Sequence, residues 1–192
     1  MDGLEQLARI GAAARGGVTR PGLGREEQRA CELVASWMAE AGLEVSWDAA
    51  GNLFGRRPGR DPGAPEVWSG SHLDTVPEGG RFDGSLGVVT ALEAARRLAS
   101  EQLRSTLVVC VFRDEEGCRF GRGVFGSRAV CGRVGEADLD LRDADGMTVR
   151  DALSALGYAG PPGVRPALPA SFVEVHVEQG PRSSAPACRW RR

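Results

Sequence analysis

Two histidines are the scarcest metal-binding side chains in this chain of 192 residues, and both stand among carboxylates. His72 lies two residues before Asp74, and His176 lies two residues before Glu178. In an extended segment, residues two apart point to the same side. His72 and Asp74 can therefore act together, one as a metal ligand and the other in support. A carboxylate hydrogen-bonded to a ligating imidazole fixes its tautomer and raises its basicity.

Two more carboxylate segments could join the histidines. Asp83 precedes Gly84 just before a predicted helix, where it can reach two metals while the glycine lets the backbone pass close by. Glu115 and Glu116 follow an apolar run and point in different directions, so one can bind metal while the other stays free as a base. Each segment alone is a weak signal. Together they indicate a site for zinc, or else for manganese, cobalt or nickel.

The elements that position these residues follow from hydrophobic spacing. Helical periodicity is predicted over 1–15, 25–41, 84–100 and 148–156, and strands over 43–47, 53–56, 67–70, 107–112 and 172–178. The valine-rich run 107–112 is typical of a strand buried on both faces of a parallel sheet. Strict alternation over 172–178 places Glu174, His176 and Glu178 on one side. Strands interleaved with helices predict a layered α/β fold.

Composition excludes several classes of function. Lys and Arg number 24, all of them arginine, against 26 Asp and Glu, so no basic excess favours nucleic acid. No apolar stretch approaches the roughly 18 residues of a membrane span, and the first residues lack a secretory layout. The five cysteines form no C-x-x-C pair, so we expect buried thiols, with Cys118 a packing residue rather than a ligand. These features predict a cytoplasmic protein without nucleic-acid or membrane partners.

Four strings carry a family resemblance: Gly70–Gly84, Phe112–Gly117, Gly126–Ala129 and His176–Pro181. They resemble the M20 metallopeptidase-type hydrolases and, more narrowly, the hydantoinase/carbamoylase branch. That branch includes N-carbamoyl-L-amino acid hydrolases, allantoate amidohydrolases and β-ureidopropionases. Segments 17–20 and 51–56 also fit, so the resemblance spans residues 1–181. The element His-Val-Glu-Gln-Gly-Pro separates the branch from ordinary M20 peptidases.

The resemblance implies an α/β/α zinc-hydrolase catalytic domain with two divalent metal ions. It would cleave a C–N bond of a ureido compound (an N-carbamoyl-L-amino acid, allantoate or ureidopropionate) through a metal-activated water. The implied roles are one metal on His72 and His176, a bridge by Asp83, the second metal on Glu116, a general base in Glu115, orientation of His72 by Asp74, and substrate contact by Gln179. The alternatives are an inactive fragment and an M20 peptidase or acyl-amino-acid deacylase.

The family pattern ends at Pro181. Members of the branch continue with a lid and dimerisation domain, and then complete the catalytic domain with the last histidine of the second metal and a substrate-binding arginine. Residues 182–192 depart from this pattern, with a composition typical of a GC-rich gene read in a shifted frame. We therefore expect 1–181 to be the N-terminal portion of the catalytic domain, with one complete metal site. We expect no lid domain, no family homodimer interface and little or no hydrolase activity.

Overall fold

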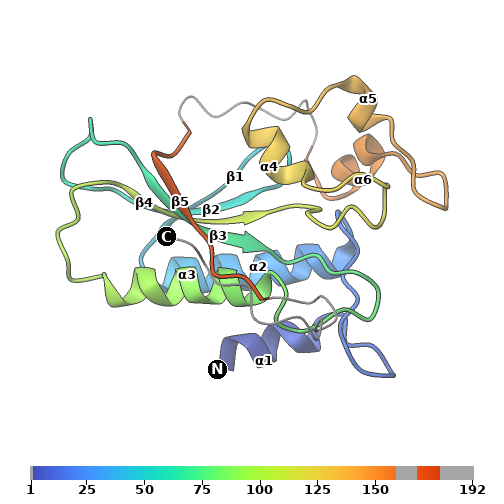
Figure 1. The fold of residues 1–192 in the computed structure, drawn as a ribbon, viewed down its shortest axis with the longest axis horizontal. Helices are drawn as coiled ribbons and strands as arrows, with labels where there is room; N and C mark the ends of the chain where they lie inside the picture. The colour runs from blue at the N-terminus through green and yellow to red at the C-terminus, as the bar shows by residue number, and fades with distance from the viewer. Residues whose placement is uncertain (1, 159–167, 178–192) are drawn as a thin grey trace, which may run out of the picture.

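A mixed β-sheet forms the middle layer of the computed structural model, which describes residues 2–158 and 168–177 (Figure 1). Within these residues five strands lie in the order β1-β2-β4-β3-β5. Their bounds are β1 Glu44–Trp47, β2 Leu53–Arg57, β3 Val67–His72, β4 Leu107–Phe112 and β5 Ser171–Val173. The pairs β1–β2 and β2–β4 are antiparallel, whereas β4, β3 and β5 run parallel.

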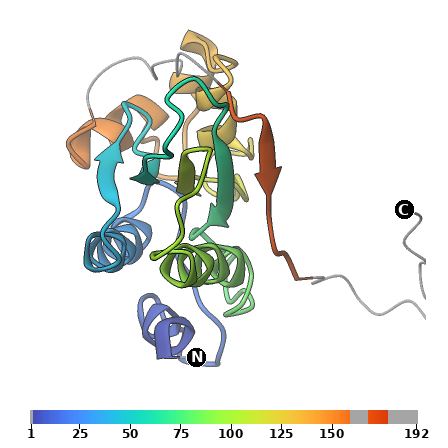
Figure 2. The same ribbon diagram turned by 90° about the vertical axis from the view of Figure 1, so that its left-hand side faces the viewer.

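Helices cover both faces of the sheet, as Figures 1 and 2 show. On one side lie α2 (Arg25–Glu40) and α3 (Ser85–Arg97), with α1 (Asp2–Arg9) beneath them. On the other side lie the shorter α4 (Phe125–Val130), α5 (Glu136–Leu139) and α6 (Val149–Ala155). The predicted α/β/α layering is therefore confirmed.

Alternation along β4 supplies a core on each side of the sheet. Val109 and Val111 pack into the cluster formed with α2 and α3, whereas Val108 and Cys110 pack with Trp68 on the opposite face. Successive side chains of a strand point to opposite faces, so a strand that is apolar at every position is buried on both. The valine-rich run predicted this burial correctly. Its sheet is only partly parallel, because β4 pairs antiparallel with β2.

One helical expectation needs correction, and two short helices were not expected. The first helix ends at Arg9 rather than near residue 15. Gly11 follows with a φ of +78°, and Ala12 then forms an antiparallel bridge with Val18. The short helices α4 and α5 were not predicted, because too few of their residues repeat at helical spacing to mark them.

The strand predicted over 172–178 is shorter in the structure, where β5 ends at Val173. Its last backbone pairing joins Val173 to Ser69 of β3. One residue further on, the contact with β3 is a side-chain hydrogen bond, in which the Ser71 hydroxyl donates to the Glu174 carboxylate. His176 therefore lies beyond the strand and not within it. Two valines that alternate with these polar residues are exposed, Val173 to 57% and Val175 to 41%.

No helix among the described residues has both the length and the apolar character needed to cross a membrane.

Candidate metal centre

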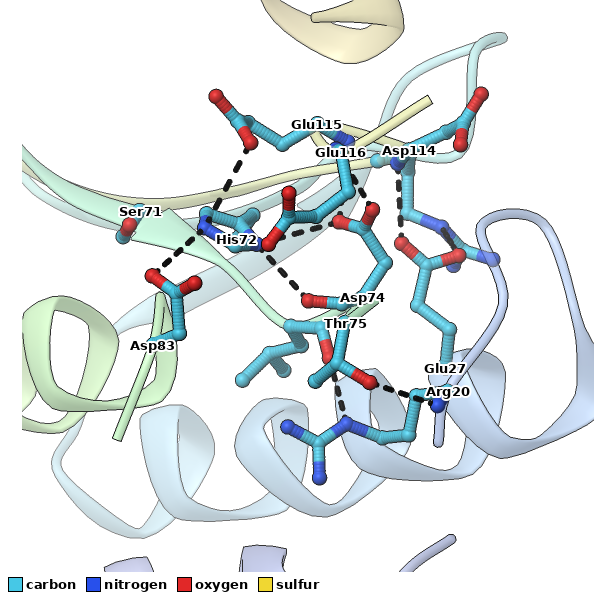
Figure 3. Close-up of polar contacts among 12 residues, drawn as sticks. Arg20, Glu27, Ser71, His72, Asp74, Thr75, Asp83, Asp114, Glu115 and Glu116 are labelled. Carbon is cyan, nitrogen blue, oxygen red and sulfur yellow. Dashed lines mark hydrogen bonds and ion pairs between the residues drawn. The ribbon is translucent and has the colours of Figure 1, made fainter. Parts of the chain in front are cut away.

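His72 is the buried centre of the candidate site, at the carboxyl end of β3 (Figure 3). Its Nδ1 lies 3.0 Å from the backbone oxygen of Asp74 and 3.3 Å from that residue's Oδ1. Its Nε2 points the other way and lies 3.8 Å from both Asp83 Oδ1 and Glu115 Oε2. Since a proton on Nδ1 satisfies Asp74, Nε2 is the nitrogen that would offer its lone pair to a metal.

A glycine lets α3 begin close enough to bring Asp83 to this imidazole. Gly84 has a φ of +59°, and a Cβ there would lie 2.4 Å from the His72 backbone oxygen and 2.8 Å from its ring. Only glycine adopts this conformation without strain and leaves that space free. The close passage that the sequence predicts at this position is present in the structure.

Arg20 links the end of β3 to the start of α3. Its guanidinium is fully buried and donates to the Leu73 backbone oxygen at 2.5 Å and to Ser85 Oγ at 3.0 Å. The first contact lies just after β3 and the second in the first turn of α3. Arg20 therefore fixes the distance between the segments that carry His72 and Asp83. Sequence analysis gave Arg20 no such role, because these contacts join residues more than 50 positions apart.

His176 approaches the cluster from the segment that follows β5. Its Nε2 lies 3.2 Å from Asp83 Oδ1, and the centroids of the two imidazole rings are 5.9 Å apart. Its Nδ1 lies 2.9 Å from Glu174 Oε1. Glu174 thus pairs with His176 as Asp74 pairs with His72, in each case from two residues away. Sequence analysis missed this partner, although the spacing of a carboxylate two residues from a histidine was visible.

Glu115 and Glu116 lie directly after β4, beside His72 in space. The backbone N–H of Glu115 donates to Asp74 Oδ1 at 3.0 Å, and that of Glu116 donates to Asp74 Oδ2 at 2.9 Å. Asp74 was predicted only to orient His72. The structure shows that the same carboxylate also holds the backbone of both glutamates.

The cluster concentrates negative charge around one imidazole. Burial alone lowers the pKa of His72, but the hydrogen bond and charge of Asp74, with the charges of Glu115 and Asp83, outweigh it and raise that pKa to about 9. The pKa of Glu116 is raised to about 7. Burial is the largest cause, the charges of Asp83 and Glu115 add to it, and the charge of His72 opposes it. Carboxylates crowded in this way favour a cation among them.

The donor set fits a divalent metal ion. Ligand atoms of His72, Asp83 and His176 all lie within 4.8 Å of one another, as do those of His72, Glu115 and Glu116. Mixed imidazole and carboxylate donors suit zinc and related ions. The resemblance implies Asp83 as the residue between two metals. In the structure His72 is common to both groups, and Asp83 belongs to the first of them.

A pocket of about 450 Å³ opens beside His72 and Glu115. Its other walls are mainly apolar and include Trp68, Phe112 and Phe172. The cluster is therefore reachable from solvent along the face of the sheet that carries α4.

Other expected residues lie apart from this cluster. Gln179 and the tail 182–192 are outside the described residues. Cys31 and Cys110 are buried as expected, but Cys118 and Cys131 are exposed, which corrects the expectation of buried thiols for these two. Cys118 belongs to neither group of metal-type donors.

Comparison with known proteins identifies the architecture. The family model described as Peptidase family M28 matches residues 52–145. An N-carbamoyl-L-amino acid amidohydrolase from Geobacillus stearothermophilus is 43% identical, over 92% of this chain and 45% of that protein. An allantoate deiminase from Arabidopsis thaliana is 36% identical, over 80% of this chain and 31% of that protein. A hydantoinase/carbamoylase family amidase from Burkholderia ambifaria superposes with a TM-score of 0.85 at 42% identity, over 94% of this chain and 45% of that one.

The layered fold corresponds to part of the fold of the hydantoinase/carbamoylase family amidase, so this chain forms an incomplete catalytic domain of that architecture. Over 94% of its length the chain is similar to that hydantoinase/carbamoylase family amidase, in agreement with the resemblance of its motifs. It spans about 45% of the length of the first relatives it matches.

Proposed function

We propose that this chain supplies the metal-binding part of a hydrolase that cleaves a C–N bond of a ureido compound. The observation that carries the proposal is the convergence of two histidines and three carboxylates at the end of β3 and β4, beside a pocket that His72 and Glu115 line. The substrate class rests on relatives named N-carbamoyl-L-amino acid amidohydrolase and allantoate deiminase. The candidate substrates are an N-carbamoyl-L-amino acid, allantoate and ureidopropionate.

His72, Asp83 and His176 would hold one divalent ion, and Glu116 with Asp83 would contribute to a second. Zinc is the first candidate, with manganese, cobalt and nickel as alternatives. Such an ion, when bound, supplies Lewis-acid polarisation of a carbonyl and lowers the pKa of water. Asp74 keeps the His72 ring in the orientation that directs Nε2 toward the cluster.

Glu115 is the proposed general base. Its side chain is 38% exposed and reaches toward His72 Nε2, while its backbone is fixed by Asp74. The carboxylate can therefore take a proton from the attacking water and pass it to the leaving nitrogen, a role typically worth about 10²–10⁴ in rate. Gln179 is proposed as a substrate contact on the resemblance alone.

Metal content after dialysis tests the site directly. Wild-type protein loaded with Zn²⁺ should retain metal, whereas His72→Ala, which removes the donor common to both groups, should lose most of it. Glu101→Gln changes an exposed carboxylate outside the cluster and serves as the control. Equal zinc in wild type and His72→Ala would contradict the assignment.

Turnover assays separate the substrate classes. A protein extended to the length of its relatives should hydrolyse ureido compounds faster than dipeptides, and the reverse ranking would favour the peptidase alternative. The same assay on the 192-residue chain tests the second candidate, an inactive fragment. That candidate is favoured by the 45% coverage of the relatives, and ureido turnover by the chain alone would contradict it.

A further inference from the structure

The loop that carries the two glutamates is held in an unusual way. The four consecutive N–H groups of residues 113–116 all donate to side-chain oxygens. The first donates to Asn52 Oδ1 at 3.0 Å, the second to Glu27 Oε1 at 3.2 Å, and the third and fourth to the Asp74 carboxylate. These acceptors come from three different parts of the chain, 41 to 87 residues away.

The carbonyl side of the loop is fixed as well. The N–H groups of Val124, Phe125 and Gly126 donate to the backbone oxygens of residues 115, 114 and 113 at 2.7, 3.0 and 2.8 Å. Asp114 sits between the two sets of bonds with a φ of +48°, a conformation that non-glycine residues rarely adopt. Such a conformation persists only where the surrounding structure holds it in place.

Glu27 holds this strained residue from α2. Its side chain is fully buried, and besides the Asp114 N–H it accepts from Arg113 Nε at 2.9 Å and from the Leu23 N–H at 2.7 Å. Arg113 is also fully buried. A buried ion pair adds little net stability compared with apolar packing, so the geometry that it imposes explains its position here better than stability does.

We propose that Glu27 is a positioning residue for Glu115 and Glu116. It fixes the backbone one residue before the pair and the side chain two residues before it, and so sets the directions in which the two carboxylates leave the loop. Asp74 accepts the next two N–H groups of the same loop, and Figure 3 shows it beside Glu27. The inference rests on the proposed function, in which Glu115 is the base and Glu116 a metal ligand.

Amide hydrogen exchange tests the positioning without any metal. In Glu27→Gln the amides of residues 114–116 should exchange roughly 10-fold faster or more, because a hydrogen bond to a charged acceptor is lost. Amides of β3 and β4 should stay protected. Glu40→Gln, an exposed carboxylate at the far end of the same helix, is the matched control and should change nothing. Unchanged exchange at 114–116 overturns the proposal.

A double variant covers the case in which Glu27→Gln fails to fold because Arg113 is left unpaired. Glu27→Met with Arg113→Met replaces the ion pair by apolar side chains of similar length, an exchange that buried pairs commonly tolerate. The same local loss of protection at 114–116 is expected in it. Protection equal to wild type in the folded double variant also overturns the proposal.

Zn²⁺ titration followed through amide signals gives a readout that a purely structural role would not move. Signals near Asp83 should shift at the same Zn²⁺ concentration in wild type and Glu27→Gln, whereas those of Glu116 should need about 10-fold more in the variant. If the Glu116 signals shift at the same Zn²⁺ concentration in wild type and Glu27→Gln, the proposal is overturned. Absence of any shift in wild type refutes the proposed metal function instead, and the exchange experiment still decides the role of Glu27.

Discussion

Asp74 shows how much of the candidate centre depends on one side chain. Its Oδ1 lies 3.3 Å from His72 Nδ1, and its two oxygens accept the N–H groups of Glu115 and Glu116. Three donors therefore share one buried carboxylate. A neutral amide of the same shape offers a single oxygen and places an N–H₂ group against a donor.

The variant Asp74→Asn should therefore damage both folding and metal binding. We expect a loss of about 1–3 kcal/mol in the free energy of unfolding, since buried donors lose their acceptor. Zn²⁺ affinity should fall by about 10- to 100-fold, as for other partners of ligating histidines. Urea unfolding and zinc titration measure the two effects. Asp145→Asn, on an exposed loop, is the control, and a wild-type zinc affinity in Asp74→Asn would refute the shared role.

At the scale of elements, the centre exists because the end of β3 meets the start of α3. Gly84 permits this meeting through its positive φ and its lack of a Cβ, and Arg20 secures it through Leu73 and Ser85. Asp83 reaches His72 only as a consequence of this junction. The position of a ligand is thus determined by how two elements pack and not by the ligand itself.

Gly84→Ala should separate the two elements. Its Cβ would meet His72 at 2.4 Å while the backbone is held at φ +59°, so we expect a destabilisation of about 1–3 kcal/mol together with weaker zinc binding. Gly42→Ala is a matched control, because Gly42 has a φ of +73° with nothing within 4 Å. It carries the conformational cost without the clash and should leave zinc affinity unchanged. Equal effects of the two variants in unfolding and zinc titrations would refute the steric argument.

Local pattern predicted the elements that bury the most apolar surface. The run Leu107–Phe112 became β4 with the same bounds, and the helix expected over 25–41 became α2. The strand predicted through His176 ends at Val173 in the structure. Alternation indicates which side chains share a face, but it does not show whether a neighbouring strand continues alongside. The short α4 carried no periodic signal of its own.

The site was predictable as far as ligand chemistry goes, and no further. His72, Asp83, Glu115, Glu116 and His176 were chosen by residue type and context, and the structure brings their side chains together. Glu27 and Asn52 were not predicted, because their bonds to the loop cross 87 and 61 residues of sequence. A side chain that accepts a distant backbone N–H leaves no periodic trace near either partner.

For the molecule as a whole, the cluster is a source of repulsion that a bound cation would relieve. Three carboxylates and two histidines meet at the carboxyl end of β3 and β4, and the ionised carboxylates are acceptors only. Any ion that binds the folded chain and not the unfolded one raises the free energy of unfolding by mass action. Stability should therefore respond to divalent metal.

With Zn²⁺ at about 100 times its dissociation constant, the free energy of unfolding should rise by about 2.7 kcal/mol. Thermal unfolding with Zn²⁺, and with a chelator added in excess, measures this difference. His72→Ala, which lacks the donor common to both groups, should show no response to zinc. A response of the same size in His72→Ala would mean that the ion binds elsewhere.

The three side chains that accept the four N–H groups of residues 113–116 also define what a protein engineer would have to transplant. Moving only the histidines and carboxylates to another scaffold would leave the glutamate loop without the acceptors that hold it, which come from α2, from the start of β2 and from the segment after β3. The smallest portable unit is therefore the ligand set together with Glu27, Asn52 and Asp74. A recipient fold must offer a helix and two strand ends that meet at one loop.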